Sequence, residues 1–299
     1  MRDSRSEEAL IIGANGLVGR RVGKSLLDKG IKWIGTSNKR HQENSLSLDI
    51  TDSVAMADLF ARICPKAVFH CANLAGGVDF CEKNPEAARK FHLEATKEMA
   101  KHCENSASVL IFISTDYVFD GTDGPYKEET AVNPLNLYGR LKLDAERWIQ
   151  DNMKRYLIIR TTNIYGWDPE TLTPNYIMSL YRSVKEGKTF NAPSFLWGNP
   201  TYVGDLAEAI AELYIKEARG IFHIVGSSFV NRLEWAMKAC EILGLDGSVV
   251  SEIKKPPENM TARPLKSWLS SEKFRNSYAT LLRDLYDGLR QVKSDMKTF

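Results

Sequence analysis

Residues Leu10–Gly19 read LIIGANGLVG, a short apolar run followed by glycines spaced Gly-x-x-Gly-x-x-Gly. The run predicts a buried strand, and the apolar spacing over 17–29 predicts a helix after it. A strand, a glycine-rich turn and a helix form the context of a dinucleotide-binding fingerprint, where the backbone approaches a pyrophosphate at the helix N-terminus. The same glycines would also suit an ordinary structural turn. The cofactor contacts predicted from this segment are Gly13, Asn15, Gly16, Leu17 and Gly19.

Apolar runs alternate with helical patterns along the rest of the chain. Strands are predicted at 10–12, 33–35, 67–71, 109–113, 157–160 and 221–225, and helices at 17–29, 53–63, 85–104, 134–152 and 203–216. This alternation predicts an α/β fold, a Rossmann-type doubly wound parallel sheet with helices on both faces. We expect a dinucleotide-binding domain over 9–166, to which 199–226 returns. Irregular sequence after Gly166 predicts a smaller C-terminal substrate lobe over 167–198 and 227–299.

Composition narrows the class of protein. The chain has 299 residues, of which 43% are hydrophobic, so it can bury a full core. The formal net charge of +2 gives no reason to expect a nucleic-acid or membrane surface. The five cysteines are scattered and the five histidines lack metal-ligand spacing, so we expect reduced thiols and no metal. The first eight residues are charged and unlike a signal peptide, which favours a cytoplasmic protein.

Tyr138 and Lys142 lie four residues apart within the helix predicted at 134–152. Positions i and i+4 share one helix face, and a nearby ammonium lowers the pKa of a phenol, which is ordinarily about 10. A tyrosine tuned in this way acts as a general acid or base near neutral pH. Together with the hydroxyl of Thr115, the pair supplies what a nicotinamide enzyme needs to protonate a carbonyl. The alternative is a Tyr–Lys pair on a solvated helix face.

The sequence after the second predicted strand bears on the choice of nicotinamide. An acidic residue there would bind the adenosine ribose hydroxyls and indicate NAD, but residues 35–40 read GTSNKR. Ser37 with Lys39 or Arg40 would instead suit a 2′-phosphate. NADP(H) is therefore favoured, whereas NAD(H) would have to be held by backbone contacts alone.

These motifs resemble the extended short-chain dehydrogenase/reductase family, which has a Gly-x-x-Gly-x-x-Gly turn and a Tyr-x-x-x-Lys pair. More narrowly, the chain resembles the dTDP-4-dehydrorhamnose reductase branch in STDYVFDG at 114–121, PLNLYGRLKLDAE at 134–146 and RTTNIYG at 160–166. Weaker matches lie at 198–202 and 262–264. The resemblance extends from about residue 9 to about residue 270, nearly the whole chain.

The resemblance implies reduction of the C4 ketone of a nucleotide-linked 4-keto-6-deoxy sugar. Thr115 would hydrogen-bond the substrate carbonyl, Tyr138 would donate the proton, and Lys142 would also hold the nicotinamide ribose. Further cofactor contacts would be Asp49 and Ile50 at the adenine, and Ala72, Asn73 and Ala75 at the nicotinamide. The last three residues could instead form only a turn at the end of a strand.

On the substrate side, Asp116 and Tyr117 stand where related dehydratases carry Asp-Glu, and the missing glutamate favours reduction over elimination. Both would contact the sugar, although Asp116 could simply cap a turn. Asn163 replaces the tryptophan of the rhamnose branch and resembles the epimerase branch, where it contacts a diphosphate. Trp197 and Arg263 would contact the base and the diphosphate, or only pack within the lobe.

Other functions stay open at this point. A sugar-nucleotide epimerase of the same family would keep and recycle its nicotinamide. A non-catalytic NADP-binding subunit, resembling the regulatory beta subunit of methionine adenosyltransferase, would retain similar Asp-Tyr-Val-Phe-Asp-Gly and Leu-Tyr-Gly motifs. The resemblance also implies an asparagine in the helix after Pro85, where this chain has Glu94, and a homodimer paired through helices beside the active site.

Overall fold

The computed structural model describes residues 9–38, 45–170 and 174–298. At its centre is a seven-stranded sheet, ordered β11-β6-β5-β4-β1-β2-β3, in which every neighbouring pair is parallel. The predicted Rossmann-type α/β fold is confirmed. The strands are β1 (Ala9–Ile12), β2 (Trp33–Ser37), β3 (Ser45–Ser47), β4 (Ala67–His70), β5 (Val109–Thr115), β6 (Tyr156–Thr161) and β11 (Gly220–His223).

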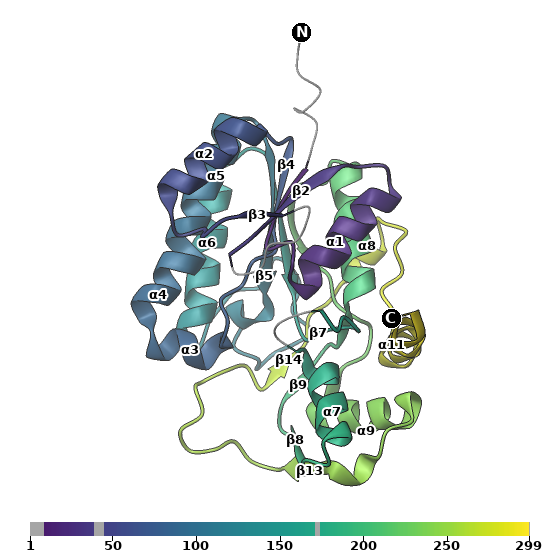
Figure 1. Ribbon diagram of the computed structural model, residues 1–299. Coiled ribbons are helices and arrows are strands. Elements are labelled where there is room, and N and C mark those ends of the chain that lie inside the picture. The colour runs from purple at the N-terminus through teal and green to yellow at the C-terminus, as the bar shows by residue number, and fades with distance from the viewer. Residues whose placement is uncertain (1–8, 39–44, 171–173, 299) are drawn as a thin grey trace.

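Helices cover both faces of this sheet (Figure 1). Alternate residues of β1 explain the arrangement, because Ile11 packs into the core of one face and Ile12 into that of the other. A strand buried on both sides reads in sequence as a continuous apolar run, which made β1 visible. The helices on the Ile11 side are α1 (Leu17–Asp28) and α8 (Val203–Ile215), and those on the Ile12 side include α2 (Ser53–Ile63), α5 (Ala95–Asn105) and α6 (Leu137–Asn152).

The segment predicted as one helix over 85–104 differs from that expectation. It consists of α4 (Pro85–Arg89), a π-helical turn η1 (Lys90–Glu94) and α5. π-helical turns inside helices are uncommon and occur frequently at functional sites. The short helix α3 (Gly77–Lys83) precedes it and was not predicted, because its N-cap Gly76, at φ +92°, reads in sequence as a turn.

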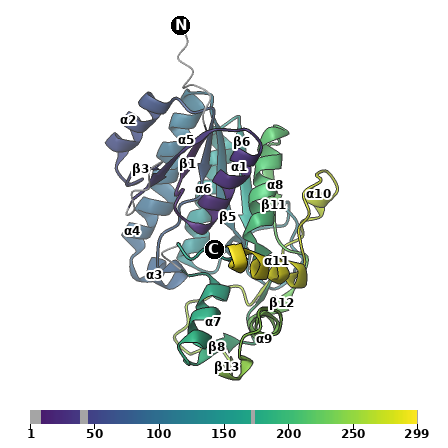
Figure 2. The same ribbon diagram turned by 45° about the vertical axis from the view of Figure 1, so that its right-hand side comes forward.

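The elements beyond the carboxyl ends of the sheet strands form what we call the lobe (Figures 1 and 2). Two small sheets build it, β13-β8 and β12-β9-β14. Its core gathers around Trp235, Tyr165, Ile177 and Leu289. The lobe contains α7 (Tyr176–Lys185), β8 (Phe190–Pro193), β9 (Trp197–Gly198), β12 (Val230–Asn231), α9 (Arg232–Leu243), η3 (Gly247–Val249), β13 (Val250–Ile253), β14 (Lys266–Ser267) and α11 (Leu285–Thr298).

Smaller elements connect the lobe to the sheet. They are η2 (Asp116–Val118), β7 (Ile164–Tyr165), β10 (Thr201–Tyr202) and α10 (Glu272–Arg275). Between lobe segments, the chain returns to the sheet through α8 and β11, which pairs with β6. Within the described ranges, no helix has the length and apolar character needed to cross a membrane.

Candidate active site

The glycine-rich turn between β1 and α1 forms a cradle that leaves no room for a side chain at Gly13 or Gly19. Gly13 has φ +82°, and a Cβ there would lie 2.8 Å from the Ala72 backbone. A Cβ on Gly19 would lie 2.3 Å from the carbonyl oxygen of Gly13. No side chain caps α1 at Gly16, and no acidic residue stands in its first turn. Because the first N–H groups of a helix lack intrahelical partners, this cradle fits a pyrophosphate.

The other predicted cofactor residues lie around the same edge of the sheet. Ser37 ends β2, next to β1, and Asn73 and Ala75 lie exposed after β4. Asp49 accepts hydrogen bonds from the Thr51 amide at 2.9 Å and hydroxyl at 2.8 Å, which hold the pKa of its carboxyl below the usual value. Ile50 is buried, and Asn15 offers its carbonyl oxygen to Arg20 Nε at 3.3 Å. Lys39 and Arg40 lie outside the described residues.

The structure brings Thr115, Tyr138 and Lys142 together where β5 ends and α6 begins. Asn136 starts α6 by accepting the amide hydrogen of Gly139 at 2.8 Å, which sets Tyr138 in the first turn. A hydrogen bond joins the Tyr138 and Thr115 side chains. One turn farther, Lys142 Nζ donates to the Ile113 carbonyl at 2.5 Å and lies 3.9 Å from the Phe112 ring centroid. The phenol and the ammonium are thereby fixed against the end of β5.

Burial controls the protonation of this group. Burial raises the pKa of Tyr138, the Asp116 charge raises it further, and the hydrogen bond with Thr115 opposes both. The expected lowering of the Tyr138 pKa is therefore wrong for the protein by itself, because burial and the Asp116 charge raise it. Burial also lowers the pKa of Lys142 to about 7, against the opposing charge of Glu146. At neutral pH Tyr138 keeps its proton, as a proton donor requires.

Two buried histidines lie near Tyr138 and Lys142. The π-helical turn η1 places His92 edge-on to the Tyr138 ring, with the centroids 5.1 Å apart. His70 Nε2 lies 3.2 Å from the Thr96 hydroxyl, while His70 Nδ1 and His92 Nε2 are buried without a hydrogen-bond partner. Burial, followed by the charge of Lys142, lowers the pKa of each imidazole to about 3. Both rings are therefore neutral across the physiological range.

This geometry corrects the position assigned to the family asparagine. Glu94 lies on the outer surface of the turn, 3.7 Å from Lys97, with half of its side chain exposed. The residue of this helix that faces Tyr138 is His92. Sequence reasoning missed it because a π-helical turn shifts the residues that follow relative to a regular helix.

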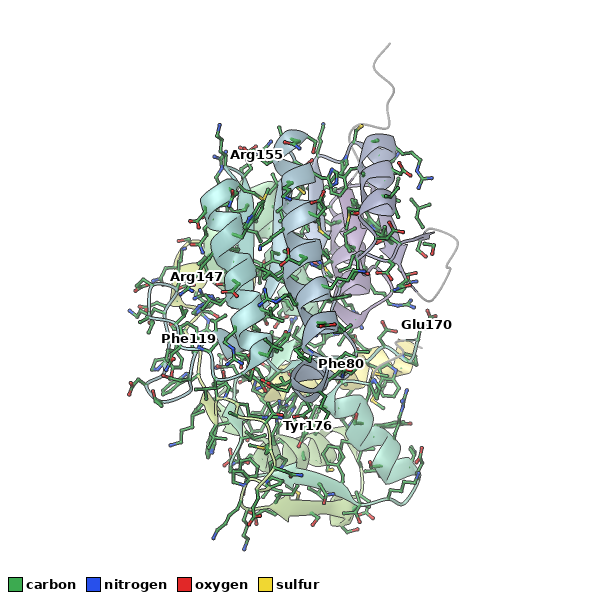
Figure 3. All side chains as sticks on the ribbon, turned by 90° about the vertical axis from the view of Figure 1, so that its left-hand side faces the viewer. Phe80, Phe119, Arg147, Arg155, Glu170 and Tyr176 are labelled. Carbon is green, nitrogen blue, oxygen red and sulfur yellow. The ribbon has the colours of Figure 1, made fainter. Side chains whose placement is uncertain are left out.

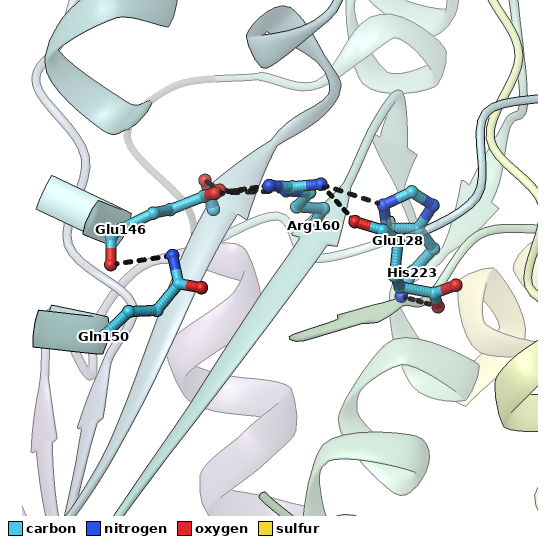
Figure 4. Close-up of polar contacts among 6 residues, drawn as sticks. Glu128, Glu146, Gln150, Arg160 and His223 are labelled. Carbon is cyan, nitrogen blue, oxygen red and sulfur yellow. Dashed lines mark hydrogen bonds and ion pairs between the residues drawn. The ribbon is translucent and has the colours of Figure 1, made fainter. Parts of the chain in front are cut away.

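A buried ion pair anchors α6 to the sheet (Figure 4). Glu146, one turn after Lys142, is fully buried and accepts Arg160 Nη2 at 2.7 Å and Nε at 3.1 Å. The hydroxyl of Ser114, the residue before Thr115, also donates to Glu146. The far side of the guanidinium contacts the Glu128 carbonyl at 3.3 Å and His223 Nε2 at 3.5 Å. Sequence reasoning included Glu146 in a motif but gave it no role, although its spacing from Lys142 was visible.

The residues predicted to bind substrate occupy different settings. Tyr117 lies edge-on to Tyr138, with ring centroids 5.9 Å apart. Asp116 is buried, and its carboxylate accepts the hydroxyls of Ser267 and Thr115 within the protein. Trp197 packs against Phe229, with ring centroids 5.6 Å apart. Asp116 thus ties β5 to β14, and Trp197 belongs to an aromatic stack of the lobe.

The two remaining substrate predictions involve arginines. Arg263 pairs with Asp79 of α3 at 2.6 Å. Asn163 has the left-handed φ of +52°, and its side-chain oxygen accepts a hydrogen bond from Arg232 of α9. Burial raises the pKa of Tyr117, and the charge of Asp116 raises it further, whereas the charges of Arg263 and Arg232 lower it. Arg232 was missed because no local pattern marks it.

Comparison with known proteins identifies the family of the chain. The sequence model described as RmlD substrate binding domain matches residues 7–298. The chain is 31% identical over 271 residues to methionine adenosyltransferase 2 subunit beta of Xenopus tropicalis, covering 89% of this chain and 80% of that one. A hypothetical dTDP-4-dehydrorhamnose reductase from Sulfolobus tokodaii superimposes with a TM-score of 0.83 at 33% identity, covering 94% and 98% of the two chains.

A second solved structure bears on the cofactor. The dTDP-4-dehydrorhamnose reductase of Bacillus anthracis superimposes with a TM-score of 0.86 at 26% identity, covering 97% of this chain and 99% of that one. It was crystallised in complex with NADP, so NADP(H) binding occurs in this family. The chain therefore belongs to the RmlD substrate-binding-domain family, the dTDP-4-dehydrorhamnose reductase branch of the extended short-chain dehydrogenases/reductases.

Proposed function

We propose that the protein is an NADP(H)-dependent reductase of the C4 ketone in a nucleotide-linked 4-keto-6-deoxy sugar. The observation that carries this proposal is the meeting of Thr115, Tyr138 and Lys142 at the carboxyl end of β5, in the same sheet edge as the Gly13 cradle. Ligands of doubly wound sheets bind at this edge. The solved reductases that the chain resembles supply the reaction class.

Bound NADPH supplies a hydride to the carbonyl carbon. When substrate binds, the Thr115 hydroxyl hydrogen turns from Asp116 to the carbonyl oxygen and holds it. The Tyr138 O–H bond breaks as the new O–H bond forms on that oxygen, so one hydride and one proton convert the ketone to an alcohol. Lys142 is held by the Ile113 carbonyl, and its protonated amine stabilises the phenolate left on Tyr138. Asp116 takes no part in proton transfer, because Ser267 and Thr115 occupy its carboxylate.

The preference for NADP(H) over NAD(H) in this chain belongs to the same proposal. Ser37 at the end of β2, with Lys39 or Arg40, would bind the 2′-phosphate. The NADP complex of the Bacillus anthracis reductase supports this choice.

The test follows NADPH and NADH oxidation at the nicotinamide absorbance with dTDP-, UDP-, GDP- and CDP-linked 4-keto-6-deoxy sugars. One sugar is expected to give rapid oxidation, with NADPH preferred. Tyr138→Phe should reduce turnover by about 10²- to 10⁴-fold while NADPH affinity stays unchanged. Tyr286→Phe removes the hydroxyl of an exposed α11 tyrosine and serves as the matched control. Full turnover by the Tyr138 variant would disprove the assigned role.

A regulatory subunit is the second candidate, favoured by the 31% identity to methionine adenosyltransferase 2 subunit beta. Such a protein would bind NADP(H) through the same cradle without oxidising it. Stoichiometric co-purification with a methionine adenosyltransferase catalytic chain, together with no oxidation of NADPH by any sugar in the panel, would favour it. Tyr138→Phe would then leave partner binding unchanged.

A further inference from the structure

Arg232 occupies an unusual setting at the start of α9. Its guanidinium carbon lies 5.0 Å from the Tyr176 ring centroid and 4.9 Å from that of Trp235. Tyr176, labelled in Figure 3 where the lobe meets the helices of the sheet, also donates its hydroxyl hydrogen to the Arg232 carbonyl at 2.7 Å. Nη2 donates to the side-chain oxygen of Asn163. Two aromatic faces and one amide therefore hold the guanidinium in a single place.

This guanidinium lacks the counterion that comparable arginines have. Across residues 9–38, 45–170 and 174–298, no carboxylate lies within the 4.0 Å ion-pair distance of Arg232. Several other arginines that bridge distant elements do have carboxylates, among them Arg21 with Asp295, Arg160 with Glu146, Arg263 with Asp79 and Arg283 with Asp205. A partly desolvated charge without a counterion is costly, so proteins retain it where a ligand supplies the opposite charge.

Nearby Asp116 does not fill this role. Its charge reaches Arg232 only over a distance, because Ser267 and Thr115 occupy its carboxylate oxygens. Asn163 accepts one N–H of the Arg232 guanidinium, and the guanidinium carries several more N–H groups that can bind an anion.

The position of Arg232 relative to Tyr138 indicates which part of a substrate it would meet. Tyr117 packs edge-on to Tyr138, and the charges of Arg232 and Arg263 both act on the Tyr117 phenol. An anion held by Arg232 would therefore lie in the same region of the site as Tyr117, the ring that neighbours Tyr138. In a nucleotide-linked sugar, the diphosphate lies next to the hexose.

We infer that Arg232, positioned by Asn163, Tyr176 and Trp235, binds the diphosphate of the substrate and is its principal anion contact. The inference rests on the proposed function, in which the substrate is a nucleoside diphosphate sugar. Arg263 contributes less, because Asp79 already neutralises it. The site recognises the charge of the phosphates, so the binding of every nucleoside diphosphate depends on Arg232.

The test is calorimetric titration of the NADP-saturated full chain with dTDP, UDP, GDP, CDP and the matching nucleosides. Arg232→Met should weaken binding of the best diphosphate by about 10- to 100-fold, the effect of losing a charge-assisted contact. Arg263→Met should weaken it less, and nucleoside binding should not change. Arg290→Met is the control, because Arg290 is exposed on α11 and pairs with Asp287.

A second variant tests charge without removing the arginine. Asn163→Asp places a carboxylate on the guanidinium, and aspartate tolerates the left-handed φ of this position. It should fold at least as stably as the parent and weaken diphosphate binding about 10-fold or more. This variant keeps the inference testable even if Arg232→Met does not fold.

Several outcomes would overturn the inference. They are unchanged diphosphate affinity in folded Arg232→Met or Asn163→Asp, a larger loss from Arg263→Met, and a wild-type chain that binds diphosphates no more tightly than nucleosides. Because binding is measured without turnover, failure of the reductase proposal is distinguishable. Arg232-dependent diphosphate binding, without NADPH oxidation by any sugar, would retain the anion site and reject the reductase.

Discussion

The buried pair Glu146–Arg160 gives a prediction about the stability of α6 on the sheet (Figure 4). We consider Glu146→Gln, which keeps the shape of the side chain but removes its charge. The three Glu146–Arg160 hydrogen bonds, at 2.7–3.1 Å, lose the negative charge of their acceptor. The Arg160 guanidinium stays buried, with 3% of its side chain exposed. Breaking such a pair from one side costs about 3–5 kcal/mol. The hydroxyl of Ser114 also loses a carboxylate acceptor, which adds about 1 kcal/mol.

The assay is urea denaturation of Glu146→Gln, Arg160→Met and the double variant Glu146→Gln/Arg160→Met. Each single change should lower the free energy of unfolding by about 3–5 kcal/mol. The double variant should lose less than the sum of the two, because it leaves no buried charge without a partner. Arg290→Met breaks the exposed pair with Asp287 and should cost about 0–1 kcal/mol. Single losses near 1 kcal/mol, or strict additivity in the double variant, would refute the reasoning.

Three further predictions concern pH and the cofactor cradle. Burial depresses the pKa of Lys142 to about 7, so above pH 7 the unfolded chain binds a proton that the folded chain does not, and the free energy of unfolding rises from pH 7 to 10. Lys142→Met should flatten that rise when urea denaturation is repeated across this pH range. The same dependence of unfolding free energy on pH in both proteins would contradict the prediction. Burial lowers the pKa of His70, His92 and His223 to about 3, so below pH 6.5 the unfolded chain takes up protons that the folded chain does not. The urea concentration at the midpoint of unfolding should therefore fall steadily from pH 6.5 to 4. A midpoint that does not change with pH would show that these imidazoles are not held neutral in the folded chain. Gly13→Ala should abolish NADPH binding in a fluorescence titration, because the new Cβ would lie 2.8 Å from the Ala72 backbone. Gly30→Ala is the control and should bind NADPH normally, because Gly30 has a similar φ of +76° but nothing within 4 Å of its Cβ position. Equal NADPH affinities of the two variants would show that the cradle is dispensable.

The parts of the fold that the sequence predicted are those with local physical causes. β1 and its neighbour β4 are buried on both faces, so they read as nearly unbroken apolar runs, and Tyr138 and Lys142 share a helix face through their spacing alone. β3, with three residues at the sheet edge and partial exposure, leaves no such run and was missed.

The parts that escaped prediction depend on tertiary structure. The pKa of Tyr138 rises because of burial, which no spacing rule reports. Arg232 meets Asn163 across 69 residues of sequence, and the contact exists only because α9 packs in the lobe. His92 faces Tyr138 through a π-helical turn inside what the sequence presents as a regular helix.

The pairing of β9 between β12 and β14 has a consequence for synthesis on the ribosome. The sheet through β11 and the Gly13 cradle can assemble as the chain emerges, since domains form from the N-terminal side during translation. Asp116 must wait for Ser267, 151 residues later, to receive its hydrogen bond. A nascent chain that has not yet released β14 would therefore hold Tyr138 beside an Asp116 that lacks its Ser267 partner, so the two parts of the candidate site form at different times.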